Sequence, residues 1–469
     1  MEYITQYGTQ KMLYLDWIAS GRLYRPIEKA INELFGPFIA NTHTQTSESG
    51  TRMTLSYQQA HRIIKKHVHA GNNDIIITSG FGMTSVVNKL QRILGLKKYK
   101  TTNTNFTENK RPVVFLTHME HHSNQTSWYE SIADVVILKP NADLLVDTQE
   151  LNLQLEKYKS RNIKIGAFTA CSNVTGIITP YHEMARIMHE HGGVCFVDFA
   201  ASAPYVDINM HPAKEIEKLD AIFFSPHKFL GGPGSSGVLI FDSSLYSNEA
   251  PDDSGGGTLD WTNPWGKYKY IDNIEAREDG GTPGFIQAIR TALAIKLKEK
   301  MGVARIKARE DELLSIAFKE LDKIEGLQVL ANQHRERLGI ISFYHPNIHY
   351  NLIAKLLSDR FGIQVRAGCA CAGTYGHYLL EVNYEKSQEI TKKINYGDLS
   401  QKPGWVRVSL HPTLSNKEVL FFVNALREIT KNHSVWMKDY FYNKKNNEFQ
   451  NKYESKKRLN VIKNWFMID

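Results

Sequence analysis

The sequence predicts an α/β protein: a large domain built on a mostly parallel sheet of seven strands, and a smaller α+β domain. Short apolar runs alternate with helical stretches, which is typical of a parallel sheet covered on both faces. At 469 residues the chain is long for one compact domain, and its 42% hydrophobic content provides for a substantial core. The strand candidates are residues 75–78, 113–117, 135–138, 164–169, 194–198, 221–224 and 237–241.

Helices between these strands are indicated by capping signals and by helical spacing of apolar residues. Residues 147–150, Asp-Thr-Gln-Glu, resemble a capping box, and Leu151, Leu155 and Tyr158 follow on one helical face. A second helix, 181–191, runs up to a glycine, which is a common helix terminator. Ligands of such sheets collect at the carboxyl ends of the strands, so the site is expected there.

The domain boundaries follow from a predicted long helix. Residues 286–301 lead out of the sheet region, so we expect a large domain at 16–296. The smaller domain then comprises 297–430 together with residues 1–15. Residues 431–469 form a basic tail rich in Lys and Asn. Its charge would allow contact with nucleic acid or an acidic partner, but a solvated helix or loose tail is the expected interpretation. Its aromatic residues, among them Trp436 and Tyr440, indicate that parts of it pack.

Composition indicates a cytoplasmic enzyme with no membrane partner. The N-terminus lacks a basic region followed by an apolar core, so no secretory signal is expected. The sequence contains no run of about 20 apolar residues, so no membrane span is expected. Four cysteines in so long a chain argue against a disulfide framework and favour a reducing compartment. They are Cys171, Cys195, Cys369 and Cys371.

Residues 225–228, Ser-Pro-His-Lys, carry the most informative chemistry of the chain. They follow the apolar run 221–224 and precede a glycine-rich stretch. A lysine at the mouth of a buried strand loses hydration, which lowers its pKa and makes a neutral amine available. Such an amine can form a Schiff base, and pyridoxal phosphate is the commonest partner. Ser225 and His227 flank Lys228 with donors suited to phosphate. A surface lysine after a strand is the alternative.

Asp198 ends the apolar run 193–198 and suits the opposite end of the same cofactor. A carboxylate at the end of a buried strand is unfavourable unless it is paired. The pyridine nitrogen of pyridoxal phosphate needs such a partner, because the protonated ring is the better electron sink. Alone, Asp198 is also compatible with a helix cap or a metal ligand.

A phosphate site is indicated where residues 75–84 run from a strand through a tight turn into a helix. Free N–H groups at the start of that helix, at Gly82 and Met83, suit a phosphate together with the Thr84 hydroxyl. A simple turn is the alternative. The glycine-rich run 231–237 lacks the Lys and hydroxyl ending of a nucleotide P-loop, so that interpretation is rejected.

Three histidines follow the strand candidate at 113–117. A flat imidazole can stack on a pyridine ring and can also relay protons. The alternative is metal binding by His118, His121 and His122, which requires nearby carboxylates or thiolates that the sequence does not place. We therefore expect no metal.

Taken together, these motifs resemble the class V, fold type I pyridoxal-phosphate enzymes, which include cysteine desulfurases, selenocysteine lyases and related aminotransferases. The resemblance extends from about residue 14 to 429. It implies that the pyridine ring of the cofactor stacks on His121. It also implies that the phenolic oxygen of the cofactor contacts Asn173 and that the ring nitrogen contacts Asp198. It also implies a homodimer, because residues 280–283 resemble the loop whose threonine, here Thr282, reaches the phosphate of the neighbouring subunit.

The same resemblance assigns the substrate side. Residues 365–372 resemble the loop carrying the desulfurase cysteine, and counting from Arg366 places Cys371 at the thiol position. Arg407 resembles the arginine that binds the substrate carboxylate, with Arg366 as a second candidate. The implied activity is removal of sulfur from L-cysteine to give alanine and an enzyme persulfide. The implied partners are an amino-acid substrate and a sulfur-acceptor protein, with nucleic acid not expected.

The sequence also departs from the desulfurase pattern. Desulfurases usually carry a glutamine three residues after the pyridine-partner aspartate, where this chain has Ala201, followed by Ser202. Pro226 stands where glycine is common, and residues 373–377 are not the usual continuation of the cysteine loop. An aminotransferase, epimerase or lyase using the same cofactor without sulfur transfer is therefore the alternative function. A degenerate binding protein with this fold is a further alternative, disfavoured by the intact Lys228.

Overall fold

The computed structural model describes residues 1–42, 44–99, 107–453 and 457–467. The chain divides into two compact units. The sheet unit comprises Ile18–Ala308, and the terminal unit comprises Met1–Trp17 with Arg309–Asp469. The predicted boundaries of the large domain, 16–296, and of the tail, 431–469, stay predictions. Residues 454–456 and 468–469 of that tail lie outside the described residues.

The sheet unit is built on a seven-stranded sheet within the described residues, in the order β4-β10-β9-β8-β7-β5-β6. Strand β10 runs antiparallel to both of its neighbours and every other pairing is parallel, which confirms the predicted fold class. The strands are β4 (Asp74–Ser79), β5 (Val113–Leu116), β6 (Asp134–Ile137), β7 (Lys164–Thr169), β8 (Val194–Asp198), β9 (Ala221–Phe224) and β10 (Gly237–Asp242).

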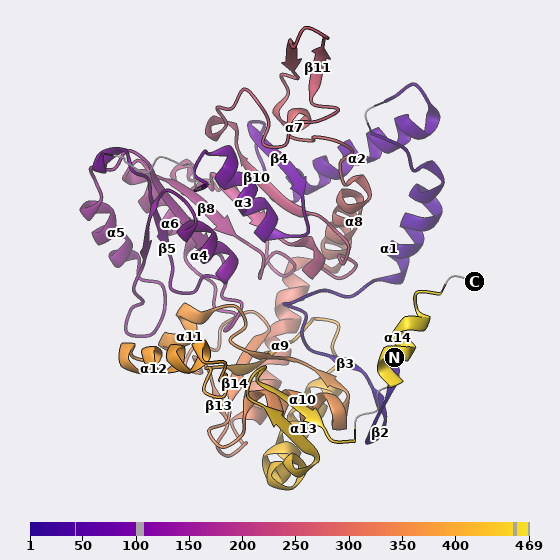
Figure 1. The fold of residues 1–469 in the computed structure, drawn as a ribbon, viewed down its shortest axis with the longest axis vertical. Helices are drawn as coiled ribbons and strands as arrows, with labels where there is room; N and C mark the ends of the chain where they lie inside the picture. The colour runs from indigo at the N-terminus through magenta and orange to yellow at the C-terminus, as the bar shows by residue number, and fades with distance from the viewer. Residues whose placement is uncertain (43, 100–106, 454–456, 468–469) are drawn as a thin grey trace. The chain divides into compact units, whose positions relative to one another are not determined.

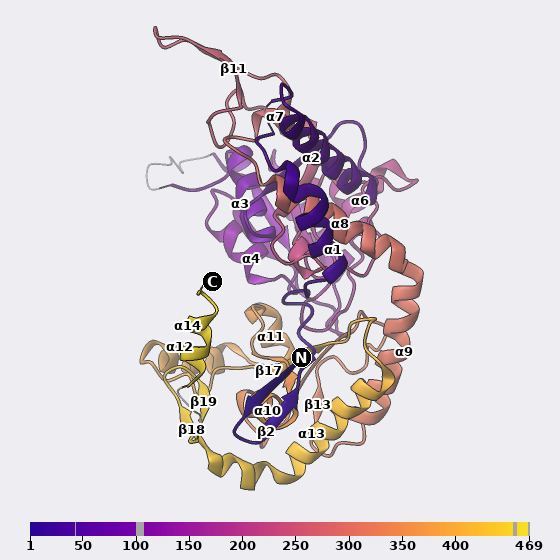
Figure 2. The ribbon, with the colours of Figure 1, turned by 90° about the vertical axis from the view of Figure 1, so that its right-hand side faces the viewer.

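Helices cover both faces of this sheet. Successive residues of a strand point to opposite faces, and both sets are largely apolar. In β5, Val113 and Phe115 join one buried cluster, and Val114 and Leu116 join the other. Figure 2 shows α3 and α4 on one side, and α1, α2, α6 and α8 on the other. The helices are α1 (Arg25–Ala30), α2 (Glu48–His67), α3 (Met83–Ile93), α4 (His122–Tyr129), α5 (Thr148–Lys157), α6 (Tyr181–Glu190), α7 (Ile274–Arg277) and α8 (Phe285–Met301).

The predicted helices between the strands are confirmed with small shifts at their ends. Asp147 is the N-cap of α5 and accepts a hydrogen bond from the backbone N–H of Gln149 at 2.9 Å. Strand β5 ends one residue before the predicted Thr117, because the Thr117 backbone N–H donates to Glu120 instead of to a neighbouring strand. A hairpin of β11 (Leu259–Thr262) and β12 (Tyr268–Tyr270) projects from the sheet unit in Figure 1.

The terminal unit holds a four-stranded sheet among its described residues, in the order β13-β14-β17-β16, with β17 antiparallel to both neighbours. Its core is formed by these strands with α9, α10 and α13. The elements are β1 (Glu2–Thr5), β2 (Gly8–Lys11), β3 (Leu13–Tyr14), α9 (Val303–Leu321, of which 303–308 belong to the sheet unit), β13 (Gln328–Val329), β14 (Ile340–Tyr344), α10 (Tyr350–Phe361), β15 (Ile363–Gln364), β16 (Arg366–Gly368), α11 (Gly373–Leu379), α12 (Tyr384–Asn395), β17 (Trp405–Ser409), α13 (Asn416–Trp436), β18 (Tyr440–Asn443), β19 (Glu448–Asn451) and α14 (Lys457–Asn464).

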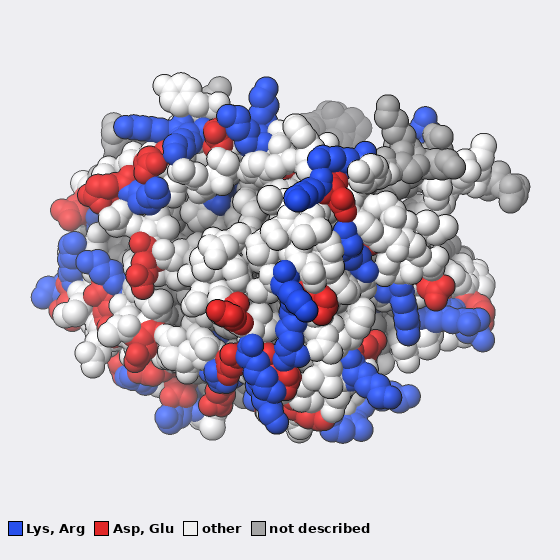
Figure 3. Space-filling model, turned by 90° about the horizontal axis from the view of Figure 1, so that it is seen from below, with Lys and Arg blue, Asp and Glu red and all other residues white. Residues whose placement is uncertain are grey.

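Surface charge is mixed on the face drawn in Figure 3, where Lys and Arg lie among Asp and Glu rather than in one continuous patch. A net charge of +8 is therefore not concentrated there as a polyanion-binding surface requires. Within the described ranges, no helix is both long and apolar enough to cross a bilayer.

Candidate active site

The residues of the predicted phosphate site come together where the N-terminus of α3 meets the end of β9. The backbone N–H of Met83 donates to Ser225 Oγ at 2.8 Å. Gly82, with φ of +152°, precedes α3, and a Cβ there would lie 3.0 Å from Ser225 Oγ and 3.5 Å from the His227 ring. A Cβ on Gly237 would collide with the Gly82 carbonyl. The turn thus brings helix N–H groups, a hydroxyl and an imidazole together, and this donor set fits a phosphate.

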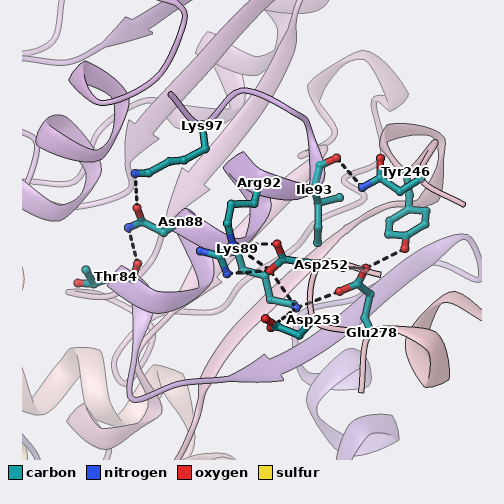
Figure 4. Close-up of polar contacts among 11 residues, drawn as sticks. Thr84, Asn88, Lys89, Arg92, Ile93, Lys97, Tyr246, Asp252, Asp253 and Glu278 are labelled. Carbon is teal, nitrogen blue, oxygen red and sulfur yellow. Dashed lines mark hydrogen bonds and ion pairs between the residues drawn. The ribbon is translucent and has the colours of Figure 1, made fainter. Parts of the chain in front are cut away.

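Thr84 links this turn to the histidine segment. Its Oγ1 lies 2.7 Å from Ser123 Oγ, which belongs to the first turn of α4. Its carbonyl accepts a hydrogen bond from Asn88 Nδ2 at 2.8 Å, and Lys97 Nζ donates to Asn88 Oδ1 at 2.6 Å (Figure 4). The first turns of α3 and α4 are therefore joined side by side.

A buried ion cluster holds the later turns of α3 in place (Figure 4). Lys89 is 2% exposed, and its Nζ lies 2.9 Å from Glu278, 3.2 Å from Asp252 and 3.1 Å from Asp253. Arg92, one turn further along α3, donates three hydrogen bonds to Asp252. The nearby carboxylates raise the pKa of the Lys89 ammonium although burial opposes them. Both cations thus hold α3 against the segment that leads to the Gly280 loop.

Asp198 and Lys228 lie close enough to influence each other's charge. Asp198 ends β8, is 3% exposed, and accepts a hydrogen bond from the Ala200 backbone N–H at 2.7 Å. Burial raises its pKa to about 6, while the Lys228 ammonium acts in the opposite direction. Burial and Lys228 also lower the pKa of His227 to about 4, so this imidazole is neutral at pH 7.

Glu120 organises the segment that carries His121. Its Oε1 accepts hydrogen bonds from the backbone N–H groups of Thr117 and Thr169 at 3.2 and 2.8 Å, and Oε2 accepts from Asn124 Nδ2 at 2.8 Å. This carboxyl is fully buried, and burial raises its pKa to about 7. One side chain thus joins the ends of β5 and β7 to the start of α4, which fixes the backbone on both sides of His121.

The three histidines have different surroundings. His121 is the N-cap of α4, and its Nδ1 accepts from the Ser123 backbone N–H at 3.1 Å. His118 is buried with Nε2 3.1 Å from the Leu144 carbonyl, and burial lowers its pKa to about 4. The ring of His122 lies 6.4 Å from that of His121. Across the described stretches of the chain, no three His, Cys, Asp or Glu side chains gather as a metal site would require.

Asn173 and the Ala201 position lie in buried segments that follow β7 and β8. Asn173 belongs to a loop in which the Val174 and Thr175 backbone N–H groups donate to a serine hydroxyl. Ala201 is buried, and so is Ser202, whose Oγ has no hydrogen-bond partner among the described residues. A buried hydroxyl without a partner is unfavourable, so this atom is suited to a polar ligand group.

Thr282 is exposed on a loop with a fixed base. A Cβ on Gly280 would collide with the Asp253 carbonyl, and the Gly281 N–H donates to the Gly256 carbonyl at 2.8 Å. Asp253 in turn belongs to the Lys89 cluster. The loop is therefore connected to α3 through Asp253. That Thr282 reaches the phosphate of a neighbouring subunit stays a prediction.

The predicted substrate residues form a group of their own in the terminal unit. Arg366 and Arg407 are directly opposite on β16 and β17. Arg407 is buried, and its Nη2 donates to Asp16 Oδ1 at 2.9 Å. Burial lowers the pKa of Arg407, and Asp16 opposes this effect. Arg366 is exposed, and its Nη2 lies 3.6 Å from Cys371 Sγ.

The cysteine loop has an unusual backbone. Ala370 and Cys371 have φ of +49° and +58°, in the left-handed region that disfavours residues with a Cβ. The Ala372 N–H closes the turn on the Cys369 carbonyl at 3.1 Å. Two adjacent residues in this conformation require support from their surroundings, and such strain is commonly found at functional sites.

Sequence reasoning missed three residues that organise these groups: Glu120, Lys89 and Asp16. Glu120 stands directly before His121, and an acid following a buried strand is the same signal that identified Asp198. Lys89 interrupts the apolar face of a predicted helix, which marks a buried charge. Asp16 pairs with a residue 391 positions away, and the sequence holds no signal for such a pair.

Comparison with known proteins gives a consistent result. The family model described as aminotransferase class V matches residues 13–422. A probable cysteine desulfurase of Halalkalibacterium halodurans is 30% identical over 368 residues, which cover 77% of this chain and 84% of that protein. Another from Staphylococcus epidermidis is 31% identical over 374 residues, covering 78% and 84%.

A solved structure supports the same fold. The apo cysteine desulfurase of Thermococcus onnurineus has a TM-score of 0.72 and 23% identity, and the match covers 90% of this chain and 95% of that one. Cysteine desulfurase CsdA of Escherichia coli has a TM-score of 0.69 and 21% identity, covering 89% and 94%.

Proposed function

The chain belongs to the class V aminotransferase family, and we propose that it is a pyridoxal-phosphate-dependent cysteine desulfurase that removes sulfur from L-cysteine. The observation that carries this proposal is the contact of 3.6 Å between Arg366 and the Sγ of Cys371 on a strained loop. A family aminotransferase needs no thiol here, whereas a desulfurase needs one that is accessible and held near a cation.

The residues of the sheet unit fit the cofactor. Ser225, His227 and the α3 N-terminus would hold the phosphate, and Asp198 would face the ring nitrogen. The bound cofactor supplies an aldehyde that captures an amine and a ring that accepts electrons. Lys228 provides the amine and afterwards holds or returns a proton at its Nζ.

Arg407 supports recognition of an amino-acid carboxylate. Its Nη2 already binds one carboxylate, that of Asp16, and a guanidinium has five N–H donors. An arginine guanidinium binds a carboxylate in bidentate geometry, so Arg407 suits the carboxylate of an amino-acid substrate. Burial strengthens that interaction, because water does not compete for it.

Cys371 acts as the sulfur acceptor in this proposal. Its thiolate bonds to the sulfur of the substrate cysteine while the carbon–sulfur bond breaks. The electron pair of that bond stays with the carbon side, which takes a proton and leaves as alanine. The enzyme keeps the sulfur as a persulfide on Cys371. The Arg366 guanidinium lies 3.6 Å from the sulfur that starts this step.

We further propose a two-fold homodimer in which Thr282 reaches the partner's phosphate, a protein that accepts the sulfur, and a reducing, cytoplasmic setting. The exposed position of Thr282 on a fixed loop supports the first. Four free cysteines support the last.

The test is alanine and sulfide release from L-cysteine by the reconstituted enzyme under reducing conditions. We expect both products from the wild type and from Cys369→Ser, and neither from Cys371→Ser. The visible spectrum of bound cofactor is expected to stay the same in all three, because the terminal-unit thiols do not hold it. A wild type that transaminates amino acids without releasing sulfur would contradict the proposal and favour the aminotransferase alternative suggested by Ala201.

A further inference from the structure

The chain continues beyond the family match, which ends at residue 422, into a hairpin of β18 and β19. This C-terminal hairpin, residues 440–451, packs on the terminal unit rather than extending from it. Tyr440 donates to Asp359 at 3.0 Å, and Asn451 Nδ2 donates to the Tyr7 hydroxyl at 2.9 Å. Tyr440 and Asn451 are both buried. A segment outside the family model is therefore an integral part of the structure.

Asn447 connects the turn of the hairpin to α10. It is buried with φ of +60°, a conformation that asparagine tolerates better than most residues. Its Nδ2 donates to the Tyr350 hydroxyl at 2.7 Å, and its Oδ1 accepts from the Tyr442 hydroxyl at 2.7 Å. The Asn447 carbonyl accepts from Asn351 Nδ2. One turn residue thus makes three hydrogen bonds, two of them to neighbouring residues of α10.

Tyr350 also contacts the segment before β17. Its hydroxyl donates to the Lys402 carbonyl at 2.8 Å, and a Cβ on Gly404 would lie 2.6 Å from its ring. The absence of a side chain at Gly404 therefore allows the backbone to rest on the phenol. Burial raises the pKa of Tyr350 to about 12, and Cys369 is near enough to contribute in the same direction.

Trp405, which follows Gly404, contacts the elements at both ends of the cysteine loop. It pairs with Gly368 at the end of β16, directly before Cys369. A Cβ on Gly376 in α11 would lie 3.0 Å from the Trp405 ring, so the helix that follows the loop rests on that ring. Trp405 is fully buried. Loop residues 369–372 are therefore flanked in sequence by β16 and α11, and both of these elements pack against Trp405.

We propose that the C-terminal hairpin positions the cysteine loop: Asn447 holds the Tyr350 phenol, which fixes Lys402–Trp405 and thereby the orientation of the loop that presents Cys371. Asn447 and Tyr350 are positioning residues, because neither touches the reacting atoms. The consequence for sulfur transfer rests on the proposed function, whereas the structural coupling does not. This coupling also explains how two adjacent residues remain in the left-handed region.

The experiment measures amide hydrogen exchange of a peptide covering residues 366–376 in the full-length protein. Asn447→Gly keeps a φ of +60° accessible but removes both side-chain hydrogen bonds. We expect exchange to be about fivefold faster in that peptide, as is typical when buried hydrogen bonds supporting a local element are lost. Tyr350→Phe should give a similar increase, and the double variant should exceed neither single variant by much, because both changes break one path.

Asn451→Ala is the matched control. It also removes a hydrogen bond from a buried asparagine of the hairpin, but at the end that contacts Tyr7. We expect its thermal midpoint to fall while exchange at 366–376 stays as in the wild type. Unchanged exchange in Asn447→Gly, or equal acceleration in Asn451→Ala, would overturn the proposal.

A kinetic measurement separates this proposal from the desulfurase assignment. With L-cysteine, Asn447→Gly should lower kcat about threefold and leave KM unchanged, because the loop presents the thiol and Arg407 binds the substrate. If the wild type forms no alanine, the desulfurase assignment fails, and the exchange comparison still decides whether the hairpin supports the loop. Faster exchange together with unchanged kcat would refute the functional part.

Discussion

Replacing Lys89 by methionine tests whether the buried ion cluster supports the phosphate site. Methionine approximates the volume of lysine without its charge, so the change leaves little cavity. It leaves Glu278, with 0% of its side chain exposed, without the cation that lies 2.9 Å away. Arg92 still neutralises Asp252. Breaking a buried pair by removing one partner typically destabilises by about 3 to 5 kcal/mol, and we expect a value in that range.

Part of this loss should be recoverable in a second variant that combines Lys89→Met with Glu278→Gln. No isolated charge then remains at either position. The amide oxygen introduced by the second change can still accept a hydrogen bond from the Tyr246 hydroxyl, which in the wild type donates to Glu278 at 2.8 Å. The double variant should therefore regain at least half of the lost stability.

The assay is urea unfolding followed by far-ultraviolet circular dichroism, with pyridoxal-phosphate binding measured by absorbance on the folded protein. Because the chain has two units, the transition of the sheet unit must be fitted separately. Affinity for the cofactor should fall with stability, since the Gly82 turn leads directly into helix α3, which carries Lys89. A single variant within about 1 kcal/mol of the wild type, or no recovery in the double variant, would show that the ion cluster does not stabilise the sheet unit as expected.

The same geometry leads to four further predictions. Lys228→Ala should lose the covalent, borohydride-reducible attachment of pyridoxal phosphate; retention of that adduct would assign it to another lysine. Arg407→Lys should raise KM for the amino acid about tenfold in steady-state assays, because one bidentate contact is lost, with less effect on kcat. Sedimentation should show a dimer, and Thr282→Ala should weaken cofactor binding; a fully loaded monomer would contradict this. Burial raises the folded-state pKa of Asp198 from 3.8 to about 6, so the folded apoprotein binds this proton more tightly than the unfolded chain. Its stability contribution should fall by about 3 kcal/mol as pH rises from about 4 to 6 and stay level above, and Asp198→Asn should flatten that part of the urea-unfolding pH profile.

The sheet was predictable because its strands are apolar on both faces and contiguous in sequence. The ends of each strand candidate lie within one residue of an observed strand, and β7, β8 and β9 match at both ends. The cofactor residues were predictable for a related reason. They stand directly after those strands, at Asp198 and Ser225, so local sequence places them at one sheet edge.

Contacts between distant segments were not predictable in this way. The Arg407–Asp16 pair spans 391 positions, and the Asn447–Tyr350 contact spans 97. Neither Asp16 nor Asn447 differs from an ordinary surface residue by local pattern. The Lys- and Asn-rich composition of the tail predicted a solvated segment, and its aromatic residues predicted that parts of it pack. Neither signal indicated that Asn447 and Asn451 are buried beside Tyr440. Composition describes the majority of side chains in a segment, whereas packing depends on a few.

Two of the buried carboxyls of the sheet unit, Glu120 and Asp198, indicate how the site is suited to a cation. Burial raises the pKa of both Glu120 and Asp198, and the charge of Asp198 raises that of Glu120 further. Glu120 has hydrogen-bond donors on both oxygens, whereas Asp198 accepts one backbone N–H and lies near Lys228. A positive charge placed against Asp198, such as a protonated ring nitrogen, would stabilise its carboxylate and lower its pKa. The carboxyl that needs a further partner is therefore the one that the sequence assigns to the cofactor, while Glu120 already has its partners within the protein and serves to order the His121 segment.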